Sequence, residues 1–413
     1  MSGGPFRAAP PLPPGVFAEV RRRTIFEACK WDPQVGDVAV LAEFPLVLEP
    51  AAWSELAVLA EALGRETLAA EAELVARPEL QRRLGLPWSV RRALRRAATD
   101  GAPPGAARFM RFDFHDTPDG WRISEVNSDV PGGWNEASGF AGIVAGHYPD
   151  LAPTGDPAGA LADAAVRATG AGGETALLHA TAYSDDHQVM AFLGGRIVER
   201  GGRIRLCSPG QLDWRDGRAH LVGNGARPFD LLLRFFPAEW LPNLPRGAGW
   251  RRHFAGGRTP AANPATAVLT QSKRFPVVWD ELRTPLPTWR ALLPETRDPR
   301  GIEPHDESWV FKPALGRVGE GIGLVGATSA RDWRAIRREL HRRPGSWVAQ
   351  RRFVVRPLAA PGGPVRVCLG VYVVDGRACG VYGRLARGPL IDAGAREAAV
   401  LLPRAAGAGK EGP

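Results

Sequence analysis

The stretch WVFKPALGRVGEGIGLV, residues 309 to 325, places a lysine on an apolar run immediately before a series of glycines. Lys312 is one of only four lysines in a chain with 53 basic residues. WVFKP and GIGLV are typical of strands, so we expect a strand–loop–strand unit that contains Gly316, Gly319, Gly321 and Gly323. A P-loop or a dinucleotide-binding motif requires a helix after the glycines, and both are therefore disfavoured. A glycine-rich hairpin can close over phosphates while a lysine supplies a point charge, although such hairpins are often simple turns.

The stretch RFMRFDFHDTPDGWRISEVNSD, residues 108 to 129, alternates apolar and polar side chains. Alternation on a strand places Met110, Phe112 and Phe114 on one face and Arg111, Asp113 and His115 on the other. The letters TPDG predict a turn near Pro118. With that turn, Arg111 would be opposite Glu125, and Asp113 would be opposite Ile123.

This register puts four polar side chains on one face of the hairpin: Arg111, Asp113, Glu125 and Asn127. Directly opposed side chains lie about 5 Å apart, so two carboxylates and an amide oxygen would repel one another unless a cation lay between them. Oxygen ligands of this kind suit Mg²⁺. The alternative is an exposed polar face that Arg111 neutralises, and the pattern alone does not choose between the two.

Composition limits the class of protein. The chain has 413 residues, of which 44% are hydrophobic and 23% charged, as in soluble globular proteins. It contains no apolar run long enough to span a membrane, and its four scattered cysteines suit a reducing cytoplasm. The net charge of +9 could indicate nucleic-acid binding, but the arginines are spread over helical faces and no recognition motif is present. We therefore expect no nucleic-acid partner and no membrane.

The order of helical and strand-like patterns predicts how the chain is organised. We expect a flexible leader over 1–15, a mainly helical region over 16–106, a segment over 107–255 that holds the hairpin and a βαβ-like substrate domain, a nucleotide-binding region over 256–400, and a flexible tail over 401–413. Within the nucleotide-binding region the patterns predict a helix near 268–283, strands near 309–325 and 347–355, a helix near 330–342 and a hairpin near 366–384.

Taken together, these stretches resemble the ATP-grasp ligases of the glutathionylspermidine synthase type. The resemblance covers about 107 to 395 and rests on the order of its pieces: Arg-x-Asp and Glu-x-Asn in the hairpin, NPATAVLTQSKRFPVVWDEL with Lys273, WVFKPALGRVGEGI with Lys312, WVAQRRF with Gln350, and LGVYVVDGRACGVYGR with Arg384. It implies the α/β ATP-grasp fold, with a preceding substrate domain and an N-terminal helical segment. We expect the synthetase part alone, with no amidase module before it.

The resemblance also implies roles for the residues that carry it. Lys273, Lys312, Gly319, Gly321, Gln350 and Arg384 would bind ATP, Asp113, Glu125 and Asn127 would hold Mg²⁺, and Arg111 would act on the transferring phosphoryl group. The activity implied is ATP-dependent joining of a small-molecule carboxylate and an amine through an acyl phosphate. The segment after Asn127 does not match the family pattern, so no particular acid or amine is implied.

Two other functions are compatible with parts of the sequence. One is a non-catalytic ATP-binding accessory protein with the same fold, and the other is a basic nucleic-acid-binding protein. The complete set of lysines and carboxylates disfavours the first, and the lack of a recognition motif disfavours the second. His115 is expected to be hydrogen-bonded and not a base, and Cys29 is expected to be structural.

Overall fold

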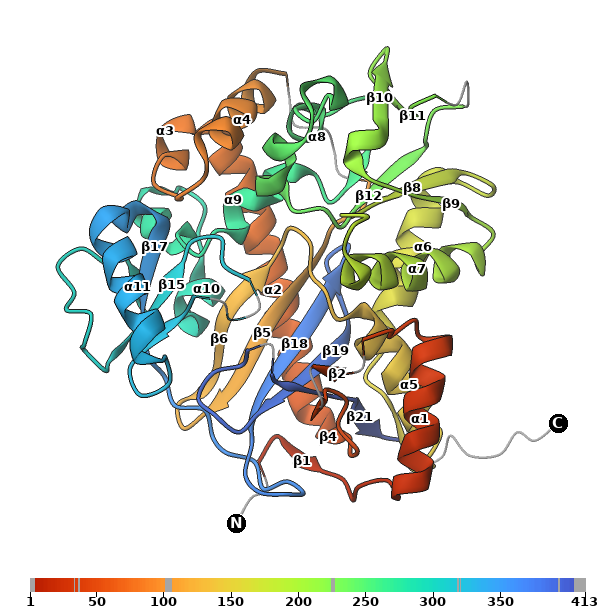
Figure 1. The fold of residues 1–413 in the computed structure, drawn as a ribbon, viewed down its shortest axis with the longest axis vertical. Coiled ribbons are helices and arrows are strands. Elements are labelled where there is room, and N and C mark those ends of the chain that lie inside the picture. The colour runs from red at the N-terminus through yellow and green to blue at the C-terminus, as the bar shows by residue number, and fades with distance from the viewer. Residues whose placement is uncertain are drawn as a thin grey trace.

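The computed structural model describes residues 4–32, 34–35, 38–100, 106–223, 227–317, 319, 321–392 and 394–404, with all side chains in these ranges except those of 34, 35, 38 and 98–100. It has the mixed α/β architecture that the sequence predicts (Figure 1).

The α-helices are α1 (Pro14–Glu27), α2 (Pro50–Ala76), α3 (Pro78–Gln81), α4 (Trp88–Asp100), α5 (Ala141–Ala145), α6 (Pro157–Thr169), α7 (Ser184–Val198), α8 (Arg252–Ala255), α9 (Val268–Gln271), α10 (Pro287–Leu292) and α11 (Ala330–Arg342). The strands are β1 (Phe6–Ala8), β2 (Gln34–Val35), β3 (Val38–Ala39), β4 (Leu46–Leu48), β5 (Phe109–Thr117), β6 (Gly120–Asn127), β7 (Leu151–Pro153), β8 (Glu174–Leu178), β9 (Arg203–Cys207), β10 (Leu212–Arg215), β11 (Arg218–Leu221), β12 (Leu231–Arg234), β13 (Ala261–Ala262), β14 (Thr296–Arg297), β15 (Trp309–Pro313), β16 (Gly323–Leu324), β17 (Trp347–Arg351), β18 (Arg366–Val374), β19 (Arg377–Ala386), β20 (Arg396–Ala398) and β21 (Val400–Pro403).

A five-stranded sheet of order β20-β19-β18-β5-β6 crosses the middle of the molecule, next to the long helix α2 (Figure 1). The apolar face of β5, with Met110, Phe112 and Phe114, belongs to the same hydrophobic core as the buried leucines of α2. The sheet joins the β5–β6 hairpin to the C-terminal strands. The predicted segment 107–255 places the hairpin together with β8, β9 and β12. In the structure the hairpin lies in a different sheet from these three strands.

A second sheet, of order β14-β17-β15-β16, carries the glycine-rich stretch. Helix α11 packs on it through Ile336 and Leu340, which contact a cluster that includes Trp309, Phe311 and Trp347. The predicted helix near 330–342 is confirmed, and β15 pairs antiparallel with β16 as the strand–loop–strand prediction requires. The predicted hairpin near 366–384 is also confirmed, as β18 and β19.

A third sheet is parallel and has the order β13-β12-β8-β9. Strand β8, helix α7 and strand β9 form the predicted βαβ unit. The helix ends just before Gly201, which adopts a φ of +82° and whose N–H donates to the carbonyl of Val198. This sheet lies at the top of the molecule in Figure 1, beside α6 and α7.

Both ends of the chain contribute to a fourth sheet, of order β1-β4-β21-β7. Phe6 is buried and pairs with Leu48, so residues 6–8 form a strand where a flexible leader over 1–15 was predicted. Likewise 401–403 belong to β21, which corrects the start of the tail predicted over 401–413; residues 405–413 lie outside the described part. Each strand contains too few apolar residues for a repeating pattern to be visible in the sequence.

The segment 268–283 is not one helix. Helix α9 ends at Gln271, and a 3₁₀ segment follows over Phe275–Glu281. Pro276 explains the break, because the ring of a proline within an α-helix would clash with the carbonyl four residues earlier, here that of Ser272. Lys273 therefore lies between two helical pieces, and its backbone N–H donates to the carbonyl of Ala314 at 2.9 Å.

None of the helices in the described part of the chain is long and apolar enough to span a lipid bilayer.

Candidate functional site

The β5–β6 hairpin differs in register from the prediction. Arg111 pairs with Asn127 and Phe114 pairs with Ile123, and the register shifts between Phe112 and Phe114. The expected pairs of Arg111 with Glu125 and of Asp113 with Ile123 are therefore wrong. The shift leaves two residues, Ser124 and Glu125, opposite Asp113, which is the geometry of a β-bulge.

Asp113 is the centre of a buried ionic cluster. Its Oδ1 accepts from Arg111 Nε at 2.7 Å, and its Oδ2 accepts from Arg384 Nη2 at 2.7 Å. Asn127 Nδ2 lies 3.4 Å from the same Oδ2. The side chain of Asp113 is 0% exposed, so the alternative of an exposed polar face is wrong, although Arg111 does neutralise this carboxylate. Both arginines also lie over the ring of Tyr382.

Glu125 faces the lysine of the segment after α9. Lys273 Nζ lies 2.9 Å from Glu125 Oε2 and donates to the carbonyl of Gly316 at 2.6 Å. Burial alone would raise the pKa of Glu125, but Lys273 and Lys312 outweigh it and hold this pKa well below its usual range. Lys273 thus connects the hairpin to the glycine-rich stretch.

Lys312 and Gln350 lie on neighbouring strands and meet side by side. Val310 pairs with Gln350 in the register of β15 and β17, so Lys312, two residues further along, lies on the same face. Lys312 Nζ donates to Gln350 Oε1 at 2.6 Å and to the carbonyl of Ser124 at 3.2 Å. Burial lowers the pKa of Lys312 to about 8, because Glu125 offsets burial only in part.

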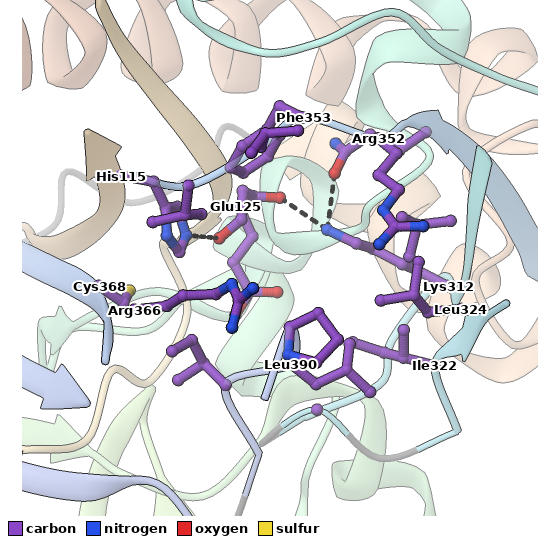
Figure 2. A pocket seen from close by; sticks show the side chains of 18 of the residues that line it. His115, Glu125, Lys312, Ile322, Leu324, Arg352, Phe353, Arg366, Cys368 and Leu390 are labelled. Carbon is purple, nitrogen blue, oxygen red and sulfur yellow. Dashed lines mark hydrogen bonds between the residues drawn. The ribbon is translucent and has the colours of Figure 1, made fainter. Parts of the chain in front are cut away.

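These side chains line one end of a first cavity, which Figure 2 shows. Its other walls are largely apolar and come from β15, β16, the segment after β17 and the segment after β19: Val310, Ile322, Leu324, Phe353, Val355, Leu390 and Ile391. Sequence analysis missed this apolar wall. The strand predicted near 347–355 ends at Arg351, so 352–355 form no strand, and 389–391 form none either and carry no alternating pattern.

The two predicted loop glycines both need a positive φ, +72° at Gly319 and +67° at Gly321. Gly319 lines the first cavity and packs closely against the segment after β19, since a Cβ added there would lie 2.9 Å from the carbonyl oxygen of Ile391. Arg317 of the same loop forms an ion pair with Glu239 at 2.6 Å.

A second cavity adjoins the first, and Glu125 and Arg384 line both. Its walls carry many charges: Lys30, Asp32, Arg111, Glu136, Asp185, Asp186, Arg317, Asp392 and Glu397. The empty volumes of the two cavities, which include open solvent, are about 1050 and 1420 Å³.

The predicted site residues thus come together, with a surplus of positive charge. Arg111, Arg384, Lys273 and Lys312 face two carboxylates, Asp113 and Glu125, which gives a net charge of +2. His115 lies beside them and shares a hydrogen bond with Ser124 Oγ at 3.0 Å. Burial lowers its pKa to about 4, so the imidazole is neutral near pH 7 and accepts a proton only weakly.

The donor chemistry of the hairpin fits Mg²⁺, although no group of three or more His, Cys, Asp or Glu side chains in the described ranges could hold a metal. Mg²⁺ commonly takes one or two protein carboxylates together with phosphate oxygens and water. Asp113 and Asn127 are adjacent, Glu125 is on the neighbouring bulge, and rotating the Asn127 amide would present its oxygen in place of its nitrogen.

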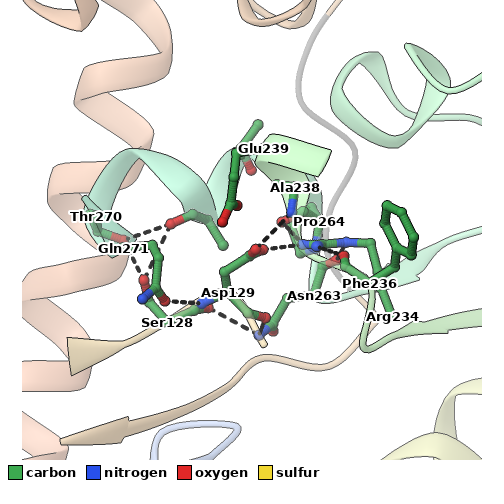
Figure 3. A network of polar contacts seen from close by, with 12 residues as sticks. Ser128, Asp129, Arg234, Phe236, Ala238, Glu239, Asn263, Pro264, Thr270 and Gln271 are labelled. Carbon is green, nitrogen blue, oxygen red and sulfur yellow. Dashed lines mark hydrogen bonds and ion pairs between the residues drawn. The ribbon is translucent and has the colours of Figure 1, made fainter. Parts of the chain in front are cut away.

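A buried polar network fixes the end of β6 that carries Glu125 and Asn127 (Figure 3). Asp129 forms an ion pair with Arg234, and both side chains are 0% exposed. The Asp129 backbone N–H donates to Gln271 Oε1 at 3.0 Å, and Ser128 Oγ lies 3.0 Å from Thr270 Oγ1. The network therefore joins the strand of Glu125 to the segment of Lys273. No motif in the sequence identified it.

Comparisons with known proteins agree with this architecture. A glutathione synthetase-like effector from Globodera pallida superposes with a TM-score of 0.63 at 11% identity, covering 95% of this chain and 98% of that one. A putative gamma-glutamylcysteine synthetase from Methylobacillus flagellatus has a TM-score of 0.43 at 11% identity, with 75% and 82% covered. No curated protein matches by sequence.

The family comparison is more specific. The model described as glutathionylspermidine synthase preATP-grasp matches residues 42–400, which is most of the chain. The mixed α/β fold of ATP-grasp-related ligases and the resemblance drawn from the sequence are both confirmed. This chain belongs to the glutathionylspermidine synthase preATP-grasp family of synthetase-type ligases.

Proposed function

We propose that this protein is an ATP-dependent carboxylate–amine ligase that forms an amide through an acyl phosphate. One observation carries the proposal: two cavities meet at Glu125 and Arg384, and the charges at their junction sum to +2. An ATP molecule with one bound Mg²⁺ carries a net charge of about −2, so the site complements that complex. The free thiols of all four cysteines support a cytoplasmic location.

The first cavity would hold the nucleotide. Its apolar wall suits the base, and Lys312 and Gln350 lie at the end where phosphates would bind. Lys273 does not line the cavity but contacts Glu125, which does. The present partners of the two lysines include neutral oxygens of Gln350, Ser124 and Gly316, which phosphate oxygens can replace. Backbone N–H groups of the loop around Gly319 and Gly321 would close over the phosphates.

Asp113, Glu125 and Asn127 would hold Mg²⁺, which neutralises and aligns the β- and γ-phosphate oxygens when bound. Arg111 and Arg384 would be drawn from Asp113 toward the transferring phosphoryl group, whose charge they can neutralise in a water-poor site.

The second cavity would receive the acid and the amine. An oxygen of the substrate carboxylate attacks the γ-phosphorus, the bond to the β-phosphate oxygen breaks, and ADP leaves. The amine nitrogen then attacks the acyl carbon, the C–O bond to phosphate breaks, and the amine loses a proton to solvent. Such chemistry depends on position and charge and needs no covalent enzyme nucleophile.

A screen of carboxylate and amine pairs for ADP release in the presence of ATP and Mg²⁺ tests the proposal. We expect release that depends on both substrates and yields an amide detectable by mass spectrometry. Tight ATP binding without release for any pair would instead favour the non-catalytic accessory protein. Absence of ATP binding would contradict both.

A further inference from the structure

The second cavity contains a lysine that the nucleotide site does not use. Lys30 follows α1 and precedes residue 42, where the family match begins. Its side chain is 8% exposed, and its Nζ lies 2.6 Å from Glu136, 3.2 Å from Glu397 and 3.5 Å from Asp32. One ammonium group therefore lies among three carboxylates.

Two of these carboxylates depend on a cation. Glu136 is 6% exposed, and its Oε2 has no hydrogen-bond partner within the described residues. Glu397 Oε1 accepts from the Tyr382 hydroxyl at 2.9 Å, and burial together with Glu136 raises the pKa of Glu397 to about 7. An uncompensated buried charge is costly, so the ion pairs with the ammonium of Lys30 stabilise both carboxylate side chains.

The charges of the cavity are distributed unevenly. Arg111 and Arg384 lie where it meets the first cavity, whereas within the described ranges Lys30 is the cation that forms ion pairs with the acidic group of Asp32, Glu136 and Glu397. Glu397 is fully ionised only above about pH 7, and there the three carboxylates outnumber the one ammonium by two. The chemistry of the acidic group is that of a site for an organic ammonium group.

We propose that Glu136 and Glu397 form a binding site for a primary ammonium group and that Lys30 occupies it as an internal ligand. A role for Lys30 in selecting the amine substrate rests on the proposed function, in which the second cavity receives the amine. Lys30 then excludes any substrate whose second ammonium group would reach these carboxylates. The enzyme thus prefers amines that carry no second positive charge at that place.

Two variants with the same loss of charge test the site without any turnover. Lys30→Ala removes the ammonium and leaves space, whereas Lys30→Met removes the ammonium and fills the space. Thermal unfolding is followed at about pH 9, above the usual pKa of a carboxyl and below that of an alkylamine, in ethylammonium chloride or sodium chloride at equal ionic strength. We expect ethylammonium at about 50 mM to restore at least half of the Tm lost by Lys30→Ala, as a ligand that binds only the folded state does. Lys30→Met should gain nothing.

Leu340→Ala is the control for a general salt effect. Leu340 packs between α11 and its sheet, in a cluster of apolar side chains, so the variant opens space without carboxylates. Equal gains in Lys30→Ala and in either Lys30→Met or Leu340→Ala, or no gain in Lys30→Ala, would overturn the site. If Lys30→Ala does not fold alone, recovery on refolding in ethylammonium and not in sodium chloride supports the site, and any other result overturns it.

Turnover tests the selectivity. Butylamine and 1,4-diaminobutane have equal chain length and differ in one ammonium group. Lys30→Ala should raise the ratio of kcat/KM for the diamine to that for the monoamine about tenfold or more over the wild type. An unchanged ratio in an enzyme that releases ADP would overturn the role in selectivity. No ADP release with any pair would refute the proposed function, while the thermal measurements would still decide whether the ammonium site exists.

Discussion

The two cavities meet at Glu125 and Arg384 but balance their charges in opposite ways. In the first, Lys312 contacts the neutral oxygens of Gln350 and Ser124, and its pKa is lowered to about 8. In the second, Lys30 contacts three carboxylates, and its pKa is raised well above the usual value although burial opposes this. The negative charge near Lys312 does not offset the effect of burial on its pKa, whereas the carboxylates around Lys30 more than offset it.

This difference separates a lysine that is ready to bind an anion from a lysine that is already paired. A buried ammonium held by neutral oxygens gains most when a phosphate arrives, because burial has removed its water without supplying a counter-charge. An ammonium among carboxylates gains little from a further anion. The same residue type can thus bind a ligand in one cavity and occupy a ligand site in the other.

The largest effect is expected at the two carboxylates of the junction. Asp113→Asn and Glu125→Gln keep the side-chain volume and remove the charge, so ADP release should fall about 100-fold or more. Alanine is less suitable at Asp113, because it would leave Arg111 and Arg384 buried without a partner at a cost of about 3–5 kcal/mol. Release rates are measured against Mg²⁺ concentration, alongside circular dichroism melts.

Asp163→Asn is the matched control, since Asp163 is an exposed carboxylate paired with Arg200 far from either cavity lining. It should leave release unchanged. Normal rates in both junction variants, or wild-type turnover that persists in EDTA, would contradict the assignment of this cluster to the phosphate end.

A smaller effect is expected when Lys312 becomes arginine. Lys312 is 7% exposed and lies between Gln350 and the Ser124 carbonyl, where a planar guanidinium does not fit as a compact ammonium does. Lys312→Arg should weaken binding of an ATP analogue at least tenfold by calorimetric titration, with Lys273→Arg similar or milder. Arg22→Lys on the exposed face of α1 is a neutral control. Unchanged affinity and rate in Lys312→Arg would remove this residue from the nucleotide site.

The lowered pKa of Lys312 predicts a dependence on pH. Phosphates favour the charged ammonium, so above about pH 8 nucleotide binding must take up a proton, and affinity should fall by up to about tenfold per pH unit. Above about pH 8 the folded state binds fewer protons at Lys312 than the unfolded state does, because the pKa of the unfolded lysine is higher. The loss of folding stability caused by burying charged Lys312 therefore becomes smaller as the pH rises above 8. Dissociation constants between about pH 7 and 9.5 provide the measurement. Lys312→Arg should show a flat profile, and equal slopes in both proteins would contradict the assignment.

Much of the first cavity could be predicted because its parts leave local signals. Alternation on β5 identified the face of Arg111 and Asp113, and the strand–loop–strand pattern identified the surroundings of Lys312. The scarcity of lysine draws attention to Lys312, which hydrogen-bonds to Gln350 in the first cavity, and to Lys273, which forms an ion pair with Glu125. It gave no role to Lys30, which lies in the second cavity. Lys410 lies outside the described residues.

The acidic group around Lys30 in the second cavity could not be predicted, because its charges come from segments that are far apart in the sequence. Lys30 meets Glu397 across 367 positions, and neither residue belongs to a motif. The bulge opposite Asp113 is a related case, since one extra residue in β6 changes every pairing beyond it and the turn sequence does not reveal it. Contacts of this kind depend on tertiary packing and not on local pattern.

The smallest expected effect compares Gly319, which lines the first cavity, with Gly321 of the same loop, which does not. Both have a positive φ, so alanine costs each a similar backbone strain, but a Cβ at Gly319 would lie 2.9 Å from the Ile391 carbonyl oxygen, whereas at Gly321 the nearest atom is Pro313 Cγ at 3.7 Å. Gly319→Ala should therefore raise the KM for ATP about fivefold and Gly321→Ala about twofold, with little change in Tm. Steady-state kinetics on the pair provide the measurement. A larger rise in the KM for ATP in Gly321→Ala than in Gly319→Ala would contradict this order. The loop would then approach the nucleotide at Gly321, and the contact with Ile391 would not determine how the loop closes over it.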